Sequence, residues 1–157
     1  MQTKLPEIAV SGLLIKKNKT LAVAESCTGG LLANMLTNVP GSSKYFLLGI
    51  VAYGNQAKIS LLNVPGKVIK RYGAVSRQVS GLMAQNVTKS ASCDYGIGIT
   101  GIAGPGGGTA RKPAGTVFIS VAGKGKTDTK KFYFSGSRLV VKRKTVLKAL
   151  SMLKKFL

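Results

Sequence analysis

The hydrophobic positions of the chain follow two spacings, one typical of amphipathic helices and one typical of buried strands. Leu31, Leu32, Met35 and Leu36 recur with a period of about 3.6 residues, which predicts a helix. Short apolar runs bounded by turn residues predict strands instead. The helices that we predict span residues 4–17, 29–38, 55–62, 64–72, 76–90 and 138 onward. The strands that we predict span residues 21–24, 45–53, 95–100, 115–122 and 129–134.

The last two long helices carry clear signals of their own. Ser76 and Ser137 stand just before them and are suited to cap their first turns. The final helix has an apolar face opposite a face of lysines. We expect that apolar face to contain Leu139, Val146, Leu150, Leu153 and Leu157.

The order of these elements predicts the fold class. Strands alternate with helices at first, and a hairpin around residues 124–126 follows. This order predicts an α/β fold with a mixed β-sheet and helices on both faces. No internal repeat or linker divides the chain, so we expect residues 1–157 to form a single domain.

The charge of the chain is strongly one-sided. Lys and Arg number 24 against 4 Asp and Glu, which gives a net charge of +20 at pH 7. Such an excess favours anionic partners such as nucleotides, nucleic acid or membrane surfaces. The lysines are dispersed rather than grouped, so a solvated basic surface is the simpler explanation. Because the sequence has no recognised nucleic-acid motif, we expect no specific nucleic-acid binding.

The residue types that are missing exclude several kinds of chemistry. The chain has no histidine, which excludes a Ser-His-Asp triad, a Cys-His pair and a histidine metal site. Two cysteines and four acids suit neither a metal cage nor a disulfide framework, so we expect no metal and no cofactor. There is no signal peptide and no apolar run of about 20 residues, so we expect a cytoplasmic protein that does not bind a membrane.

The segment "AESCTGG" places small polar residues between a predicted strand and a predicted helix. The backbone N–H groups of Thr28, Gly29 and Gly30 would be free there and could stabilise an oxyanion next to Ser26. Ser26 is therefore a candidate nucleophile, although it could simply cap the helix. Cys27 is a competing nucleophile, and it could equally be a small buried apolar residue.

The segment "YGNQAK" supplies a base that needs no histidine. A Ser-Lys pair replaces Ser-His when the lysine is neutral, and burial or nearby positive charge lowers a lysine pKa. Lys58 is the candidate, although a single lysine in so basic a chain could face solvent.

The glycine-rich segment "GIAGPGGG", residues 101–108, could let the backbone approach a phosphate or a substrate closely. It is not a Walker loop, because no Gly-Lys-Ser/Thr follows it. A flexible surface loop is the alternative.

Seven motifs, in the same order, give the chain a close resemblance to a known family. They are "AESCTGG", "PGSS", "YGNQAK", "GAVS", "ITGIAGPGGG", "KPAGTV" and "FSGSR". Together they resemble the CinA C-terminal domain family, which includes nicotinamide-nucleotide amidases. The resemblance implies a three-layer α/β/α fold, a homodimer and hydrolysis of nicotinamide mononucleotide to nicotinate mononucleotide and ammonia.

The resemblance also implies roles for individual residues. Ser26 falls on the nucleophile and Lys58 on its base partner, with Tyr53 beside them as a third catalytic residue. Thr28, Gly29 and Gly30 would hold the oxyanion. The residues implied in substrate binding are Glu25, Asn55, Thr100, Gly101, Ala103, Gly104 and, for the phosphate, Arg138.

The chain departs from the family pattern mainly where acids are usual. The family often has an acid in the glycine-rich loop, after "GAVS" and just before the arginine of "FSGSR". This chain has Gly106, Arg77 and Ser137 at these positions. The proposed nucleophile and base are retained. Two alternatives to an amidase therefore stay open, a family member without catalytic activity and a basic module that binds nucleic acid.

Overall fold

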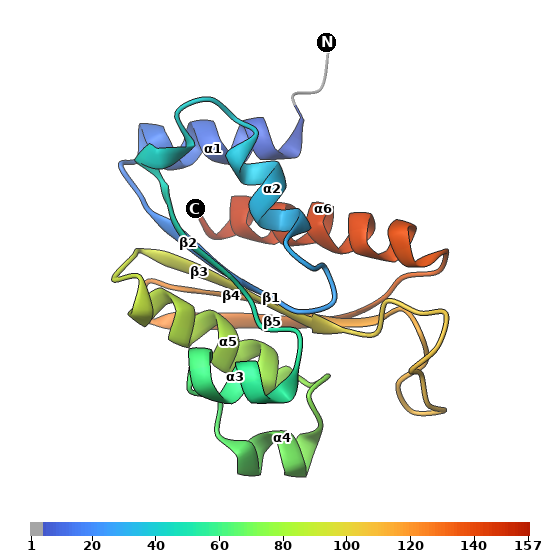
Figure 1. The fold of residues 1–157 in the computed structure, drawn as a ribbon. Coiled ribbons are helices and arrows are strands. Elements are labelled where there is room, and N and C mark those ends of the chain that lie inside the picture. Colours follow the sequence, from blue (N-terminus) through green and yellow to red (C-terminus); the bar gives the residue numbers. More distant parts are fainter. Residues whose placement is uncertain (1–4) are drawn as a thin grey trace.

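A computed structural model describes residues 5–157. These residues form a five-stranded sheet with helices on both faces, as Figure 1 shows. The elements in chain order are α1 (Pro6–Lys16), β1 (Leu21–Glu25), α2 (Leu31–Thr37), the 3-10 helix η1 (Ser42–Lys44), β2 (Phe46–Val51), α3 (Asn55–Leu62), α4 (Gly66–Tyr72), α5 (Arg77–Ser90), β3 (Tyr95–Gly101), β4 (Thr116–Gly123), β5 (Lys126–Tyr133) and α6 (Arg138–Phe156).

The sheet is mixed, as the sequence predicted. Its strand order is β2-β1-β3-β4-β5. β1 pairs in parallel with β2 and β3, whereas β4 is antiparallel to both β3 and β5. Helices α1, α2 and α6 cover one face and α3, α4 and α5 the other (Figure 1). The three-layer α/β/α fold is therefore confirmed.

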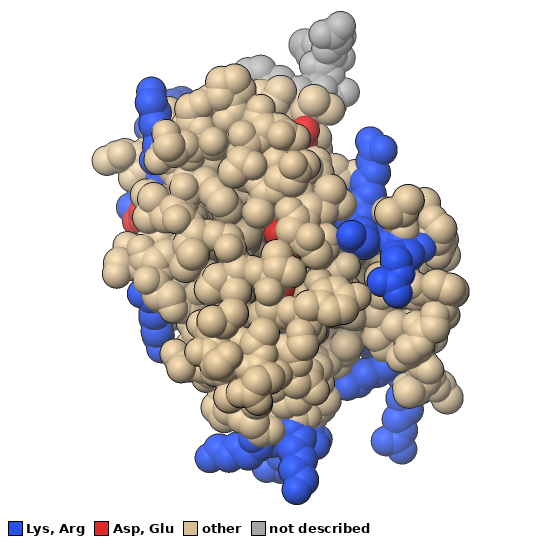
Figure 2. Space-filling model, in the orientation of Figure 1, with Lys and Arg blue, Asp and Glu red and all other residues tan. Residues whose placement is uncertain are grey.

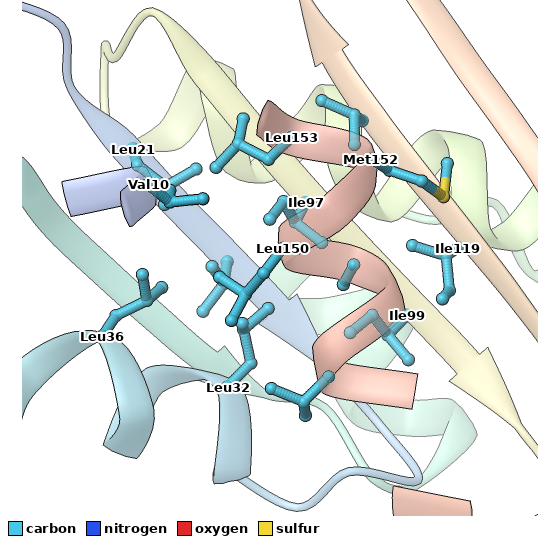
Figure 3. Packing of buried hydrophobic residues seen from close by; sticks show 14 of the residues in the cluster. Val10, Leu21, Leu32, Leu36, Ile97, Ile99, Ile119, Leu150, Met152 and Leu153 are labelled. Carbon is cyan, nitrogen blue, oxygen red and sulfur yellow. The ribbon is translucent and has the colours of Figure 1, made fainter. Parts of the chain in front are cut away.

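The core is divided into two clusters by the alternation of side chains along the strands. Leu21 and Val23 of β1 point into the cluster beneath α1, α2 and α6, while Ala22 and Ala24 point into the cluster beneath α5. Figure 3 shows the first cluster from close by, with Leu21 beside Val10 of α1 and with side chains of α2 and α6 in the same cluster. Both faces of β1 are covered, which explains why the sequence of this strand is a continuous apolar run.

Helix α5 packs directly on the backbone of β3. A Cβ atom at Gly98 would lie 2.3 Å from the carbonyl oxygen of Ser80 and 2.5 Å from the backbone nitrogen of Ala84. The Ser80 Oγ donates a hydrogen bond to the Gly98 carbonyl oxygen at 2.9 Å. Glycine is therefore required at this position of β3, because any side chain would push α5 away from the sheet.

Several helix starts differ from the sequence prediction, including that of α4, which begins at Gly66 rather than at residue 64. Helix α2 begins at Leu31 rather than at residue 29, because Gly29 and Gly30 have φ angles of 61° and 95°, in the left-handed region. The first helix begins at Pro6, and Lys4 of its predicted span lies outside the described residues. Ser76 accepts a hydrogen bond from the backbone of Val79, which confirms it as a cap.

The prediction that Leu139 is part of the buried face of the last helix was wrong. Its side chain is 74% exposed, whereas Val146, Leu150 and Leu153 are fully buried as expected. All of the first turn of α6 is exposed, and burial begins only at Val141. The apolar pattern thus begins one turn before the part of α6 that packs on the sheet. Within the described part of the chain, no helix combines the length and apolarity needed to cross a membrane.

We predict that Gly98→Ala lowers the free energy of unfolding by about 1–3 kcal/mol, because it overpacks the contact between α5 and β3. The control is Gly12→Ala on α1, where no atom lies within 4 Å of the added Cβ. Because alanine is the better helix former, this control should raise stability by up to about 1 kcal/mol. Urea unfolding followed by circular dichroism measures both. An unchanged free energy of unfolding for Gly98→Ala would contradict the prediction, because α5 would then move away from the sheet without a loss of stability.

Candidate active site

The carboxyl ends of the parallel strands β1, β2 and β3 meet at one end of the sheet, where open α/β sheets commonly bind ligands. A cavity of about 250 Å³ lies there. Its lining includes Ser26 after β1, Tyr53 after β2 and Gly101 at the end of β3. The predicted site residues that line it are Ser26, Tyr53, Asn55, Lys58, Thr100, Gly101, Ala103, Gly104 and Arg138.

Ser26 and Lys58 are in contact at the base of this cavity. The Lys58 Nζ lies 3.1 Å from the Ser26 Oγ. It also donates hydrogen bonds to the carbonyl oxygens of Ala52, at 2.9 Å, and of Tyr53, at 3.0 Å. Lys58 is only 1% exposed, so it does not face solvent.

The surroundings of Lys58 favour its neutral form. Burial lowers the pKa of the Lys58 amine below its usual value. None of its hydrogen-bond partners is a carboxylate. A neutral amine has two N–H groups and one lone pair. In the structure Nζ donates to the Ser26 Oγ. When the amine is neutral, the two carbonyl oxygens can accept its N–H groups, and its lone pair can then accept the hydroxyl proton of Ser26.

Cys27 has the opposite environment and is a poor nucleophile. It lines the cavity, but it is only 6% exposed and belongs to the core cluster beneath α1, α2 and α6. Burial raises the pKa of the Cys27 thiol to about 12. Because the thiolate is the reactive form, the interpretation of Cys27 as a small buried apolar residue fits best.

Glu25 and the start of α2 are arranged differently from the prediction. The Glu25 carboxylate is fully buried and accepts hydrogen bonds from the backbone N–H groups of Leu32 and Ala33, both at 3.0 Å. It thereby occupies the N-terminus of α2 and does not line the cavity. We therefore correct its assignment from a substrate contact to a group that stabilises this turn.

The predicted oxyanion residues need a similar correction. Thr28, Gly29 and Gly30 do not line the cavity, and the Gly29 N–H donates to the Ser26 carbonyl oxygen at 3.0 Å. The left-handed glycines turn this segment away from the cavity before α2 begins. The backbone N–H groups of Cys27, Thr28 and Gly30 have no backbone acceptor among residues 5–157, and of these three residues only Cys27 lines the cavity.

Helix α6 places one cation, Arg138, in the cavity wall and a second, Lys142, beside the turn that follows β1. The Arg138 guanidinium donates to the Tyr53 hydroxyl at 3.4 Å. Lys142 follows one helical turn later, and a Cβ atom at Gly29 would lie 3.4 Å from its Nζ. Neither ion pair found among residues 5–157 involves these two cations. The sequence prediction missed Lys142, although its spacing of four residues from Arg138 was a usable signal.

Further residues complete the cavity wall. Ala74 and Val75, from the "GAVS" motif, line it beside Ile102 of the glycine-rich segment. The Thr100 Oγ1 donates to the Ala74 carbonyl oxygen at 2.9 Å, which joins the end of β3 to the segment before α5. In residues 5–157, no three His, Cys, Asp or Glu side chains gather as metal ligands.

Comparisons with known proteins place this geometry in a family. The model of the CinA C-terminal domain matches residues 3–157. A Caldicellulosiruptor bescii protein named "Putative competence-damage inducible protein" is 48% identical over 152 residues, which cover 97% of the chain and 37% of that relative. A Clostridium botulinum protein of the same name is 46% identical over 98% of the chain and 37% of its own length. The chain thus spans little more than a third of these curated relatives.

Solved structures agree over almost the whole chain. The competence damage-inducible protein A of Klebsiella pneumoniae has a TM-score of 0.93 and 33% identity, covering 96% of this chain and 93% of that one. A CinA superfamily protein of Escherichia coli has a TM-score of 0.93 and 37% identity, covering 100% of this chain and 93% of that one. Taken with the match to residues 3–157, these similarities show that the chain belongs to the CinA C-terminal domain family.

Proposed function

We propose that the chain is an amidohydrolase that converts nicotinamide mononucleotide and water to nicotinate mononucleotide and ammonia. The observation that carries the proposal is the buried contact between Lys58 and Ser26 at the base of the cavity. Membership of the CinA C-terminal domain family supports the same reaction. The names of the relatives state no reaction, so the substrate and the mechanism are our inference.

The first step is the attack of Ser26 on the carboxamide. The lone pair of neutral Lys58 accepts the hydroxyl proton while the Ser26 Oγ bonds to the carboxamide carbon. The carbonyl oxygen becomes an oxyanion, which the backbone N–H of Cys27 stabilises. Protonated Lys58 remains in place, because all three of its N–H groups then have acceptors in Ala52, Tyr53 and Ser26.

The second step releases ammonia and regenerates the serine. Lys58 donates its new proton to the departing amide nitrogen, which leaves as ammonia while an ester forms on Ser26. Neutral Lys58 then removes a proton from water, and the resulting hydroxide attacks the ester carbon. The bond between the ester carbon and the Ser26 Oγ then breaks, and protonated Lys58 returns its proton to that oxygen. The products are free Ser26, neutral Lys58 and a carboxylic acid, which ionises at neutral pH.

Arg138 in the cavity wall and Lys142 one helical turn further along α6 suit the phosphate of a mononucleotide. Arg138 donates hydrogen bonds from a planar guanidinium, and Lys142 adds a second positive charge on the same side of α6. The ring of Tyr53 is 60% exposed beside them and offers a flat surface to the substrate. A dianionic phosphate at the mouth would hold the carboxamide end over Ser26.

We predict that Ser26→Ala and Lys58→Ala each reduce ammonia release from nicotinamide mononucleotide by at least about 10²–10⁴-fold. Each variant removes one of the two groups between which the proton is transferred. The double variant should be scarcely slower than either single variant. Lys58→Arg should not restore activity, since arginine stays protonated.

The matched control for these variants is Cys27→Ala, which changes the neighbouring residue and should retain most of the activity. Circular dichroism verifies that each variant is folded. An inactive Cys27→Ala beside an active Ser26→Ala would identify the thiol as the nucleophile and refute the proposal.

We predict that activity falls at low pH with the pKa of Lys58, because only the neutral amine can accept the serine proton. Burial lowers this pKa from its usual 10.5, so the acid limb of kcat/KM against pH should lie below pH 10.5. Activity should rise as the pH increases through this limb and then reach a plateau. The same limb should appear in Cys27→Ala, whose missing thiol would have titrated only near pH 12. A limb that disappears in Cys27→Ala contradicts this assignment.

We predict that Arg138→Ala and Lys142→Ala each raise KM for the mononucleotide by about 10-fold or more, because each loses a charge-assisted contact with the phosphate. The corresponding nucleoside, which has no phosphate, should be hydrolysed equally by both variants and the parent chain. Arg143→Ala removes the same charge from an exposed position of α6 and serves as the control. An equal loss with mononucleotide and nucleoside would mean that these cations do not bind phosphate.

A further inference from the structure

The basic side chains of the chain are distributed unevenly over its surface. Figure 2 shows the face on which α2, β2 and α3 lie, and the middle of this face has no lysine or arginine. By contrast, residues 124–157 contain nearly half of the 24 Lys and Arg residues and a single acid, Asp128. Four of these lysines line one groove between β5 and α6. The structure thus gathers charges that are dispersed along the sequence.

The groove has a volume of about 390 Å³ and shares no lining residue with the cavity that contains Ser26. Its lysines form two rows. Lys126 and Lys130 belong to β5, and Lys148 and Lys155 belong to α6. All four side chains are exposed. What this groove binds therefore does not depend on the reaction that we propose for the cavity.

The spacing of the lysines places both rows on positions that face the groove. Lys126 and Lys130 alternate along β5 and share a face with Phe132, which packs against the core cluster beneath α1, α2 and α6. The two lysines of α6 are seven residues apart, about two turns, so they lie on one side of the helix. Positions between a helix and a sheet usually hold apolar residues. Here lysines occupy them, and a hollow remains between the helix and the strand.

Two aromatic rings help to fix where the ammonium groups lie. At one end of the groove, the Lys126 Nζ is 5.0 Å from the centre of the ring of Phe156, which follows Lys155 in the chain. At the other end, the Lys148 Nζ is 5.4 Å from the centre of the ring of Phe132, two residues after the other lysine of β5. Each end thus combines one lysine of the strand with one of the helix. Four residues of a strand span about 13 Å and seven of a helix about 11 Å, so the two pairs are about that far apart.

The acids of the chain do not balance these lysines. Asp128 is the one acid that lines the groove, and its carboxylate lies 3.7 Å from the Lys130 Nζ. Four lysines and one aspartate give the groove a net charge of +3. Neither ion pair found among residues 5–157 involves the other three lysines. Like charges that are held together repel, and an anion bound between them removes this repulsion.

We propose that this groove binds a linear oligophosphate, which is either inorganic or the phosphate chain of a nucleotide. Lysine binds phosphate as a point charge, and three or more phosphates in a row place negative charge near both pairs of lysines. A single phosphate reaches only one pair, because the pairs are separated by about 11 Å or more. The volume of the groove also lies within the range of small-molecule sites, about 300–1,000 Å³.

The two aromatic rings distinguish an oligophosphate from a single-stranded nucleic acid. Single strands gain much of their affinity by stacking bases on aromatic side chains. In this groove, the ring of Phe156 faces the ammonium group of Lys126, and the ring of Phe132 faces that of Lys148. No ring of the groove is therefore free to stack with a base. A nucleotide would place its phosphates between the lysines and leave its base outside.

The experiment is isothermal titration calorimetry at about 0.15 M salt, which screens charges more than about 8 Å apart. The ligands are sodium tripolyphosphate, ATP without metal, and orthophosphate. Tripolyphosphate and ATP should bind one site with similar affinity, because the base makes no contact. Orthophosphate should bind at least about 10-fold more weakly, because it loses the charged contacts at one end of the groove.

Substitutions identify the site. Lys148→Gln and Lys155→Gln should each weaken tripolyphosphate binding about 10-fold or more. The controls are Lys131→Gln on β5 and Lys154→Gln on α6, which remove the same charge from positions that do not line the groove and should change the affinity little. Arg138→Ala, in the wall of the other cavity, should also leave the affinity unchanged. The groove and the proposed amidase site are thereby tested separately.

Several results would overturn the proposal. If tripolyphosphate does not bind in this salt, the groove is not an oligophosphate site. If the control variants weaken binding as much as the groove variants do, only the overall charge attracts the anion. ATP that binds much more tightly than tripolyphosphate would show that the base is recognised. A mixed-sequence single-stranded oligonucleotide that displaces tripolyphosphate and loses affinity in Lys148→Gln would identify the groove as a nucleic-acid surface instead.

Discussion

The burial of the Lys58 amine is the constraint around which the site is organised. An amine that is removed from water needs hydrogen-bond partners for its polar groups. Here these partners come from the turn after β1 and from the residues after β2. Helix α3 supplies the lysine itself. The positions of these three elements are therefore coupled, because a shift of any one would leave a buried polar group without a partner.

The site keeps its buried carboxylate apart from its buried amine. Glu25 directly precedes Ser26, but its charge is balanced by the backbone N–H groups at the start of α2 rather than by Lys58. A carboxylate paired with Lys58 would raise the pKa of the amine and keep it protonated. Because Glu25 bonds to the start of α2, it does not raise the pKa of Lys58, the base in the proposed reaction. The same hydrogen bonds explain why the helix terminus is not available to a substrate anion.

The sequence predicted those features that depend on local patterns. Continuous apolar runs identified β1 and β3, and the serine before α5 identified its cap. The exposed Leu139 was misplaced because a periodic pattern does not reveal where the sheet below a helix ends. The start of α2 was misplaced because left-handed φ angles at Gly29 and Gly30 are not visible in composition. The contact between Ser26 and Lys58 joins segments 32 residues apart, so family motifs indicated it while spacing alone did not.

The environment of the two thiols has a consequence for how the protein responds to oxidants. Burial raises the pKa of both Cys27 and Cys93, so neither presents the thiolate that peroxides and disulfides attack. The groups at the base of the cavity that face each other are a hydroxyl and an amine, which these reagents leave unchanged. The cysteine next to the proposed nucleophile is therefore held mainly as the thiol at neutral pH, the form that oxidants attack more slowly.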